Sequence, residues 1–235
     1  MFKIIIRGGC GKSGHKENFN IELKQGQTIA IVGPTGSGKT QLINDISYVS
    51  NGDTPSKRHV KILGSRNHNI TTVSQSNSFL SDLSVEEFLR VHADIKGKSS
   101  LIKKTIEFAN KLTGEAILPQ KSMTELSGGQ TRALMVADAL VISDSPILLL
   151  DEIENAGIDK MKVMSALKNH NKILIFVSHD PRVVLSCDKR IIMKNGEIIR
   201  VINTTEKEKV VYQKTVEMDN YLLSLREHIR NGEYL

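Results

Sequence analysis

The sequence has no tryptophan and few other aromatic residues, four tyrosines and six phenylalanines. Proteins that bind single-stranded nucleic acid stack the bases on aromatic side chains, so a nucleic-acid partner is disfavoured. The two cysteines, Cys10 and Cys187, are too few to build a disulfide framework. This scarcity favours a reducing, cytoplasmic location.

Long hydrophobic runs are also missing. The longest, such as residues 147–150 and 173–177, are strand-sized, whereas a membrane-spanning helix needs about 20 apolar residues. The first residues are apolar only briefly and do not resemble a signal peptide. We therefore expect no direct membrane insertion, so any membrane role, such as a peripheral position at the inner face of the cell membrane, must come through a partner protein.

The composition is that of a folded protein. The chain has 235 residues, 39% hydrophobic and 25% charged, which suits one large domain and excludes wholesale disorder. Its net charge of +6 fits either a polyanionic partner or a solvated surface with a modest lysine excess. No segment concentrates the charge, which favours the second interpretation.

Strand and helix patterns alternate along most of the chain. Apolar or alternating runs predict strands at residues 2–6, 19–23, 28–32, 70–73, 147–150 and 173–177. Helical spacing predicts helices at residues 41–46, 85–92 after a capping box of Ser84 and Glu87, 101–112, 132–141, 160–169 and 210–230. The turn Asn195-Gly196 predicts a late hairpin. This order predicts an α/β fold with a mostly parallel sheet and helices on its faces.

The string GPTGSGKT lies between the predicted strand 28–32 and helix 41–46. Strand, glycine-rich loop and helix together are typical of a phosphate-binding loop, whose backbone N–H groups close around phosphate oxygens. We expect Lys39 to reach the β- and γ-phosphates of a nucleoside triphosphate and Thr40 to bind Mg²⁺. A similar tripeptide, Gly11-Lys12-Ser13, has no first glycine at position 6 and no helix after it, so we interpret it as a hairpin loop.

Two further motifs carry chemistry. Asp151 and Glu152 end the apolar strand 147–150, where ligands bind in open α/β folds. Asp151 suits Mg²⁺, and Glu152 is placed to deprotonate an attacking water. LSGGQ, residues 126–130, precedes the helix 132–141, and Ser127 can cap that helix. Gly128 and Gly129 let another molecule approach the backbone closely. The motif therefore forms a second helix N-terminus that suits an anion.

Taken in order, GPTGSGKT, LSGGQ and ILLLDE resemble the ATP-binding cassette (ABC) ATPases over about residues 1–203. The resemblance implies a P-loop NTPase (RecA-like) core with an N-terminal antiparallel β subdomain. It also implies an inserted α-helical subdomain at about residues 76–125, and it leaves residues 204–235 as a C-terminal helical extension. The extension either docks a partner or packs on the body as an amphipathic helix, and we favour packing.

The resemblance also assigns residues. Gln75 matches the glutamine that senses Mg²⁺ and the γ-phosphate, His179 the histidine that contacts the γ-phosphate, and Asp159 the D-loop aspartate. The implied catalytic residues are Lys39, Gln75, Glu152 and His179, and the implied Mg²⁺ ligands are Thr40, Gln75 and Asp151. The implied nucleotide-binding residues are Gly33, Pro34, Thr35, Gly36, Ser37, Gly38, Lys39, Thr40, Gln41, Ser127, Gly128, Gly129, Gln130 and Asp159.

Three features depart from the family pattern. Ile153 stands where the family usually has proline, and Glu154 adds a second carboxylate beside Glu152, so the base is not uniquely assigned. The segment DEIENAGID is one residue longer than usual. The loop at residues 8–18 lacks the aromatic residue that stacks on adenine in the family, which leaves the choice between ATP and GTP open.

The resemblance implies a mechanism as well. Two ABC subunits, identical or different, face each other head to tail, with ATP between Lys39 of one and Ser127 and Gly129 of the other. Binding and hydrolysis then drive transport through separate membrane subunits. The alternative is a soluble ABC ATPase that acts on a protein or nucleic-acid partner in cofactor assembly, translation or DNA maintenance. A P-loop kinase is disfavoured because it has no use for LSGGQ.

Overall fold

A small antiparallel sheet forms near the N-terminus. The computed structural model describes residues 1–65, 68–74, 82–151, 160–168 and 170–234. In the small sheet β1 (Lys3–Arg7) lies between β2 (Asn20–Lys24) and β4 (His59–Leu63). The predicted strands near residues 2–6 and 19–23 are confirmed. Strand β4 was not predicted from the sequence, although its residues alternate between exposed and buried as expected for a half-buried strand.

The second sheet has six strands in the order β5-β6-β7-β3-β8-β9. All neighbours are parallel except the hairpin of the last two, so the predicted mostly parallel sheet and late hairpin are confirmed. The strands are β3 (Thr28–Val32), β5 (Ile70–Val73), β6 (Ile147–Asp151), β7 (Ile173–Val177), β8 (Lys189–Lys194) and β9 (Glu197–Asn203).

The parallel sheet separates two hydrophobic cores. In β3, Ile29 and Ile31 pack with the small sheet and α1 (Lys39–Ser47), while Ala30 joins the core on the other face. β7 is buried along its whole length and divides its residues in the same way. A strand buried on both faces is apolar throughout, which is why the sequence showed unbroken runs here.

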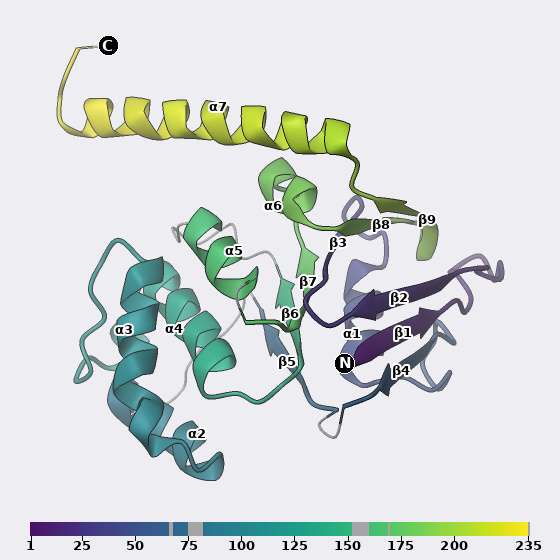
Figure 1. The fold of residues 1–235 in the computed structure, drawn as a ribbon, viewed down its shortest axis with the longest axis horizontal. Helices are drawn as coiled ribbons and strands as arrows, with labels where there is room; N and C mark the ends of the chain where they lie inside the picture. The colour runs from purple at the N-terminus through teal and green to yellow at the C-terminus, as the bar shows by residue number, and fades with distance from the viewer. Residues whose placement is uncertain (66–67, 75–81, 152–159, 169, 235) are drawn as a thin grey trace.

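Helices cover the face of the sheet opposite the small sheet (Figure 1). They are α2 (Val85–Ile95), α3 (Ile102–Leu112), α4 (Gly128–Val141), α5 (Lys160–Lys168) and α6 (Pro181–Ser186). Single 3₁₀ turns occur at Ser99–Leu101 and Met123–Glu125. Ser84 and Glu87 form a capping box at the start of α2, which stabilises its first turn. His92 of α2 pairs with Asp138 of α4 at 2.8 Å and ties these helices together.

The last helix, α7 (Glu206–Arg230), lies across α6 (Figure 1). Arg190 of β8 pairs with Glu208, and Arg182 of α6 pairs with Asp219, so ion pairs hold the helix on the body. No residue of α7 is buried. Within the described part of the chain, no helix is long and apolar enough to cross a membrane.

Candidate functional site

The parallel register brings three of the predicted motifs to one edge of the sheet. Ile31 of β3 lies opposite Val177 of β7, and Val177 lies opposite Asp151 of β6. The loops after β3 and β7 and the carboxylate of Asp151 therefore share the carboxyl edge. Neighbouring strands are about 4.8 Å apart, so Asp151 lies on the order of 10 Å from the end of β3.

The loop at residues 33–38 joins β3 to α1 and bends back on itself. Gly36 and Gly38 have φ values of 78° and 96°, a left-handed conformation that side chains disfavour. Lys39 begins α1, and its ammonium group donates hydrogen bonds to the carbonyl oxygens of Gly33 at 2.7 Å and Pro34 at 3.1 Å. The charged end of Lys39 therefore lies over the loop that precedes it.

The turn between β8 and β9 supports this loop from behind. The N–H of Gly196 donates to the carbonyl oxygen of Ser37 at 2.9 Å. A Cβ atom on Gly38 would lie 2.9 Å from the Cα of Gly196, and one on Gly33 would lie 2.4 Å from the carbonyl oxygen of Met193. The glycines of the motif therefore permit close packing as well as special backbone angles.

The loop also holds a buried hydroxyl. Ser37 is buried, and its Oγ has no hydrogen-bond partner within the described part of the chain. Unpaired buried polar atoms are rare because each loses its hydration without compensation. With no acidic residue in the first turn of α1 to oppose its positive end, the loop suits an oxyanion such as a phosphate group.

A buried ion cluster behind the loop was not predicted from the sequence. Arg58 is fully buried and pairs with Glu17 at 2.7 Å and with Asp45 at 3.1 Å. Burial opposes the charge of Arg58, but hydrogen bonds and charges from Glu17 and Asp45 outweigh burial and raise its pKa. Arg58 Nη2 also donates to the carbonyl oxygen of Gly196 at 2.8 Å, so the cluster anchors the turn that supports the loop.

The cluster extends to a predicted nucleotide-binding residue. Gln41 donates from Nε2 to Asp45 Oδ1 at 2.8 Å, which commits its amide nitrogen to the cluster. Glu17 accepts from the N–H of Ile198 at 2.7 Å and from that of Gly9 at 3.1 Å. The cluster therefore joins α1, the hairpin loop at residues 8–18 and β9.

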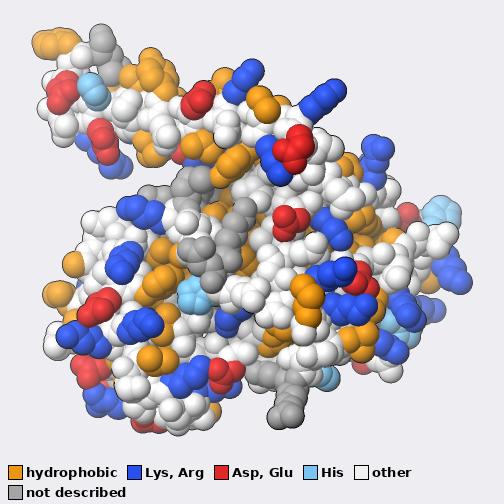
Figure 2. All heavy atoms as spheres, in the orientation of Figure 1, with side chains coloured by type: hydrophobic (Ala, Val, Ile, Leu, Met, Phe, Trp, Pro, Cys, Tyr) orange, Lys and Arg blue, Asp and Glu red, His pale blue; other side chains and the backbone are white. Residues whose placement is uncertain are grey.

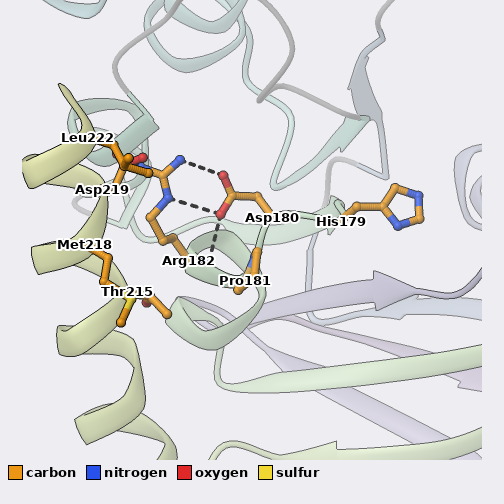
Figure 3. Close-up of a pocket in the computed structure, with 8 residues that line it drawn as sticks. All are labelled: His179, Asp180, Pro181, Arg182, Thr215, Met218, Asp219 and Leu222. Atoms are coloured by element: carbon orange, nitrogen blue, oxygen red, sulfur yellow. Dashed lines mark hydrogen bonds and ion pairs between the residues drawn. The ribbon is translucent and has the colours of Figure 1, made fainter. Parts of the chain in front are cut away.

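His179 follows β7 by two residues and lies at the rim of a cleft of about 450 Å³ between α6 and α7. In Figure 3 its ring points away from α7 and from Arg182, whose guanidinium pairs with Asp180 at 2.7 Å. The cleft is thus a different place from the glycine loop, and His179 belongs to the carboxyl edge of the sheet rather than to the cleft.

The N-terminus of α4 carries the LSGGQ motif. Ser127 Oγ accepts from the N–H of Gln130 at 3.3 Å, and Gln130 Oε1 accepts from the N–H of Ser127 at 3.1 Å. Gln130 also donates to the carbonyl oxygen of Ala116 at 3.0 Å, so its buried side chain serves the capping box. Ser127 and Gly128 are exposed, with no acidic residue in the first turn of α4.

Other predicted site residues fall into two groups. Thr40 and Thr35 are exposed at the glycine loop, where a ligand can reach them. Gln75, Glu152 and Asp159, together with the neighbours of Glu152 that depart from the family pattern, lie outside the described residues.

Among the described residues, no three or more histidine, cysteine or acidic side chains gather to hold a metal ion. Mg²⁺ commonly binds through one or two protein oxygens plus substrate phosphates, which fits Thr40 and Asp151.

Fold and site together define the class. A parallel sheet whose first strand runs into a glycine loop, with a lysine folded over the loop and a helix behind it, is a P-loop nucleotide-binding architecture. A family model described as "ABC transporter" matches residues 16–155. The chain belongs to this family and is an ABC ATPase, which binds and hydrolyses ATP.

Individual relatives agree with the family assignment. An uncharacterised ABC transporter ATP-binding protein of Methanocaldococcus jannaschii is 46% identical over 99% of this chain and 94% of that protein. The macrolide export ATP-binding/permease protein MacB of Campylobacter jejuni is 30% identical over 91% of this chain, which covers 36% of MacB. The structure of cbiO1 from Clostridium perfringens, part of the ABC transporter complex cbiONQ, matches with a TM-score of 0.65 at 26% identity, covering 97% of this chain and 98% of cbiO1.

Proposed function

We propose that this chain powers transport as the ATPase subunit of an ABC transporter, with residues 1–203 as the ATPase domain and residues 204–235 as an extension. Within that domain, about residues 76–125 form the inserted helical subdomain. One observation carries the proposal: the ammonium group of Lys39 lies over a loop whose left-handed glycines Gly36 and Gly38 leave its backbone free to surround phosphate.

The roles of the residues follow from charge. Lys39, with the loop amides, binds the β- and γ-phosphates, and His179 stabilises charge that spreads over the γ-phosphate. Glu152 orients and deprotonates the attacking water. Thr40, Gln75 and Asp151 hold Mg²⁺, which neutralises phosphate charge when bound.

A second ABC subunit completes the site in this proposal. The N-terminus of α4, with Ser127 and Gly128 exposed and Gly129 half-buried, has no acidic residue in its first turn. Such a helix end favours an anion, and a nucleotide held by the glycine loop of another subunit supplies one. We assign Asp159 to the same interface because it matches the D-loop aspartate of the family. Hydrolysis removes the γ-phosphate and weakens the contact between the subunits.

Membrane subunits are the proposed partners. MacB carries "permease" in its name and cbiO1 is part of a transporter complex, and both names support a transport role for this chain. We propose that the chain works at the cytoplasmic face of the membrane through separate membrane-spanning subunits. The test is the rate of ATP hydrolysis after co-expression with such subunits: stimulation supports transport, whereas stimulation only by a soluble partner supports the alternative role.

The nucleotide site is tested by two lysine variants. We expect Lys39→Ala to lower ATP hydrolysis by at least about 100-fold, because it removes charge stabilisation of the γ-phosphate. The control is Lys12→Ala, since the Lys12 ammonium donates to the exposed carbonyl oxygen of Gly36 at 3.3 Å and no phosphate-binding role is assigned to Lys12. We expect a change within several-fold for that variant. Phosphate release measures both, and a Lys39→Ala protein with the wild-type rate contradicts the assignment.

A further inference from the structure

The helix α7 carries a regular apolar stripe. Apolar residues and one threonine recur at alternating intervals of four and three residues, which is the repeat of a coiled-coil seam. The members are Val211, Thr215, Met218, Leu222, Leu225 and Ile229. The repeat runs through most of the helix, so it differs from the scattered apolar residues of an ordinary protein surface.

The body of the protein leaves most of this stripe exposed, although its members Thr215 and Leu225 are half-buried. Met218 is 68% exposed, Leu222 50% and Ile229 61%. Three other half-buried residues of α7, Tyr212, Val216 and Asp219, lie on the adjacent side of the helix. Figure 2 shows apolar side chains along the edges of α7, and its C-terminal half extends past α6 in Figure 1.

The stripe is held in a fixed orientation. The ion pair of Arg182 with Asp219 places the half-buried side of α7 against α6, and the stripe follows beside that contact. Thr215, Met218 and Leu222 form one wall of the cleft between α6 and α7 (Figure 3). A helix that packs on the stripe therefore meets a surface that is already ordered and carries little conformational cost.

We propose that the stripe binds α7 of a second copy of this chain as an antiparallel helix pair that forms without nucleotide. The sequence is self-complementary in this arrangement. When Leu222 lies opposite Leu225 of the second copy, Met218 lies opposite Ile229, and the seam has four apolar layers. The same register places Asp219 beside Arg226 of the second copy, once on each side of the two-fold axis.

The charges of these two residues permit that contact. Asp219 uses Oδ2 for Arg182, and a carboxylate has a second oxygen that accepts from another guanidinium. Arg226 is exposed and makes no ion pair within the described part of the chain.

A membrane surface fits the helix less well. Between Glu206 and Arg230, α7 has five acidic and five basic residues, so it lacks the basic excess that draws amphipathic helices to anionic lipid. Four layers make a weak contact, and its value lies in keeping two copies near each other between rounds of hydrolysis. The pairing is separate from the proposed ATP-dependent interface, although both have two-fold symmetry.

Disulfide cross-linking of the full chain tests the register. In a Cys10→Ser background, with Cys187 buried, we expect Met218→Cys combined with Ile229→Cys to form a disulfide-linked dimer upon oxidation without nucleotide. Each single variant should remain a monomer, because the antiparallel register separates identical positions by about 16 Å along the axis. Dimers from the single variants indicate parallel pairing and overturn the proposal, as does a double variant that stays monomeric.

Nucleotide dependence and the surface itself are tested next. The cross-link should persist when Lys39→Ala is added, and its loss assigns the contact to the ATP interface instead. By sedimentation equilibrium, Leu222→Asp should abolish self-association of the nucleotide-free chain. The matched control Leu223→Asp, at a residue 45% exposed but off the stripe, should leave it unchanged. The proposal is overturned if both variants lose self-association equally. It is also overturned if the chain floats with phosphatidylglycerol vesicles and forms no cross-link.

Discussion

At the scale of single residues, the predicted and the unpredicted parts of the site differ in how far apart their members lie in the chain. Lys39 reaches Gly33 and Pro34, six and five residues away, so a local motif was enough to place it. Arg58 reaches Glu17, 41 residues earlier. Charged residues at such separations look like ordinary surface charges in a sequence, and only the fold reveals that they are buried together.

The Arg58 cluster gives the first stability prediction. Arg58→Met should lower the free energy of unfolding by about 3–5 kcal/mol, because it leaves Glu17 and Asp45 buried without their counter-charge. The control is Arg90→Met, which removes a pair with Glu86 on the surface of α2 and should cost about 0.5 kcal/mol. Urea unfolding measures both variants, and similar costs would show that the buried cluster contributes no more than a surface pair.

At the scale of elements, strands and helices with strong local signals were predicted, and those with weak signals were missed. The β7 run, buried on both faces, and the capping box of α2 leave clear local signals. The missed β4 alternates apolar residues with His59 and Lys61 instead of forming an apolar run, and α6 has only six residues. Asp180-Pro181 does carry a start signal for α6, since Asp180 accepts from the N–H of Arg182, but nothing in the sequence fixes its length.

The C-terminal end of α4 gives a pH-dependent prediction. Lys172 donates to the carbonyl oxygens of Ala139, Ser143 and Ser145. Burial, with the nearby charge of Lys98, lowers its pKa from 10.5 to about 8. Between pH 8 and 10.5 the unfolded chain therefore binds a proton that the folded protein has released, so the stability of the folded state rises with pH in this window.

The measurement compares the wild type with Lys172→Met at pH 7.5 and 9.5. The unfolding free energy of the wild type minus that of the variant should be larger at pH 9.5 than at pH 7.5, because the variant lacks the titrating amine. Other titrating groups are common to both proteins and cancel. If this difference were instead smaller at pH 9.5, the three carbonyl oxygens would stabilise the charged amine more than burial destabilises it.

At the scale of the whole molecule, the sequence predicted a mostly parallel sheet but not how α7 is placed. The strand and helix patterns and the nucleotide-binding motifs did not give the order of the strands, which only the structure shows. The position of α7 depends on Arg182 and Arg190, which lie outside those motifs and meet Asp219 and Glu208 only in the folded protein. The sequence favoured packing of this helix on the body, and the structure shows packing along one side only, with no residue buried.

The proposed ATP-dependent pairing has a consequence for the stability of the whole molecule. A ligand that binds only the folded state stabilises it by about 2.7 kcal/mol at 100 times its dissociation constant. When two folded chains are needed to enclose the ligand, stabilisation also rises with protein concentration, whereas ATP bound to one chain gives a stabilisation that does not depend on protein concentration.

We expect the melting temperature of Glu152→Gln in ATP and Mg²⁺ to rise across a 100-fold increase in protein concentration, since this variant keeps ATP unhydrolysed. Combined with Leu222→Asp, which removes the proposed helix pair, it should keep the rise, and adding Lys39→Ala to that double variant should remove the rise. A melting temperature that stays constant across the range would mean that a single chain encloses the nucleotide, which would contradict the shared site.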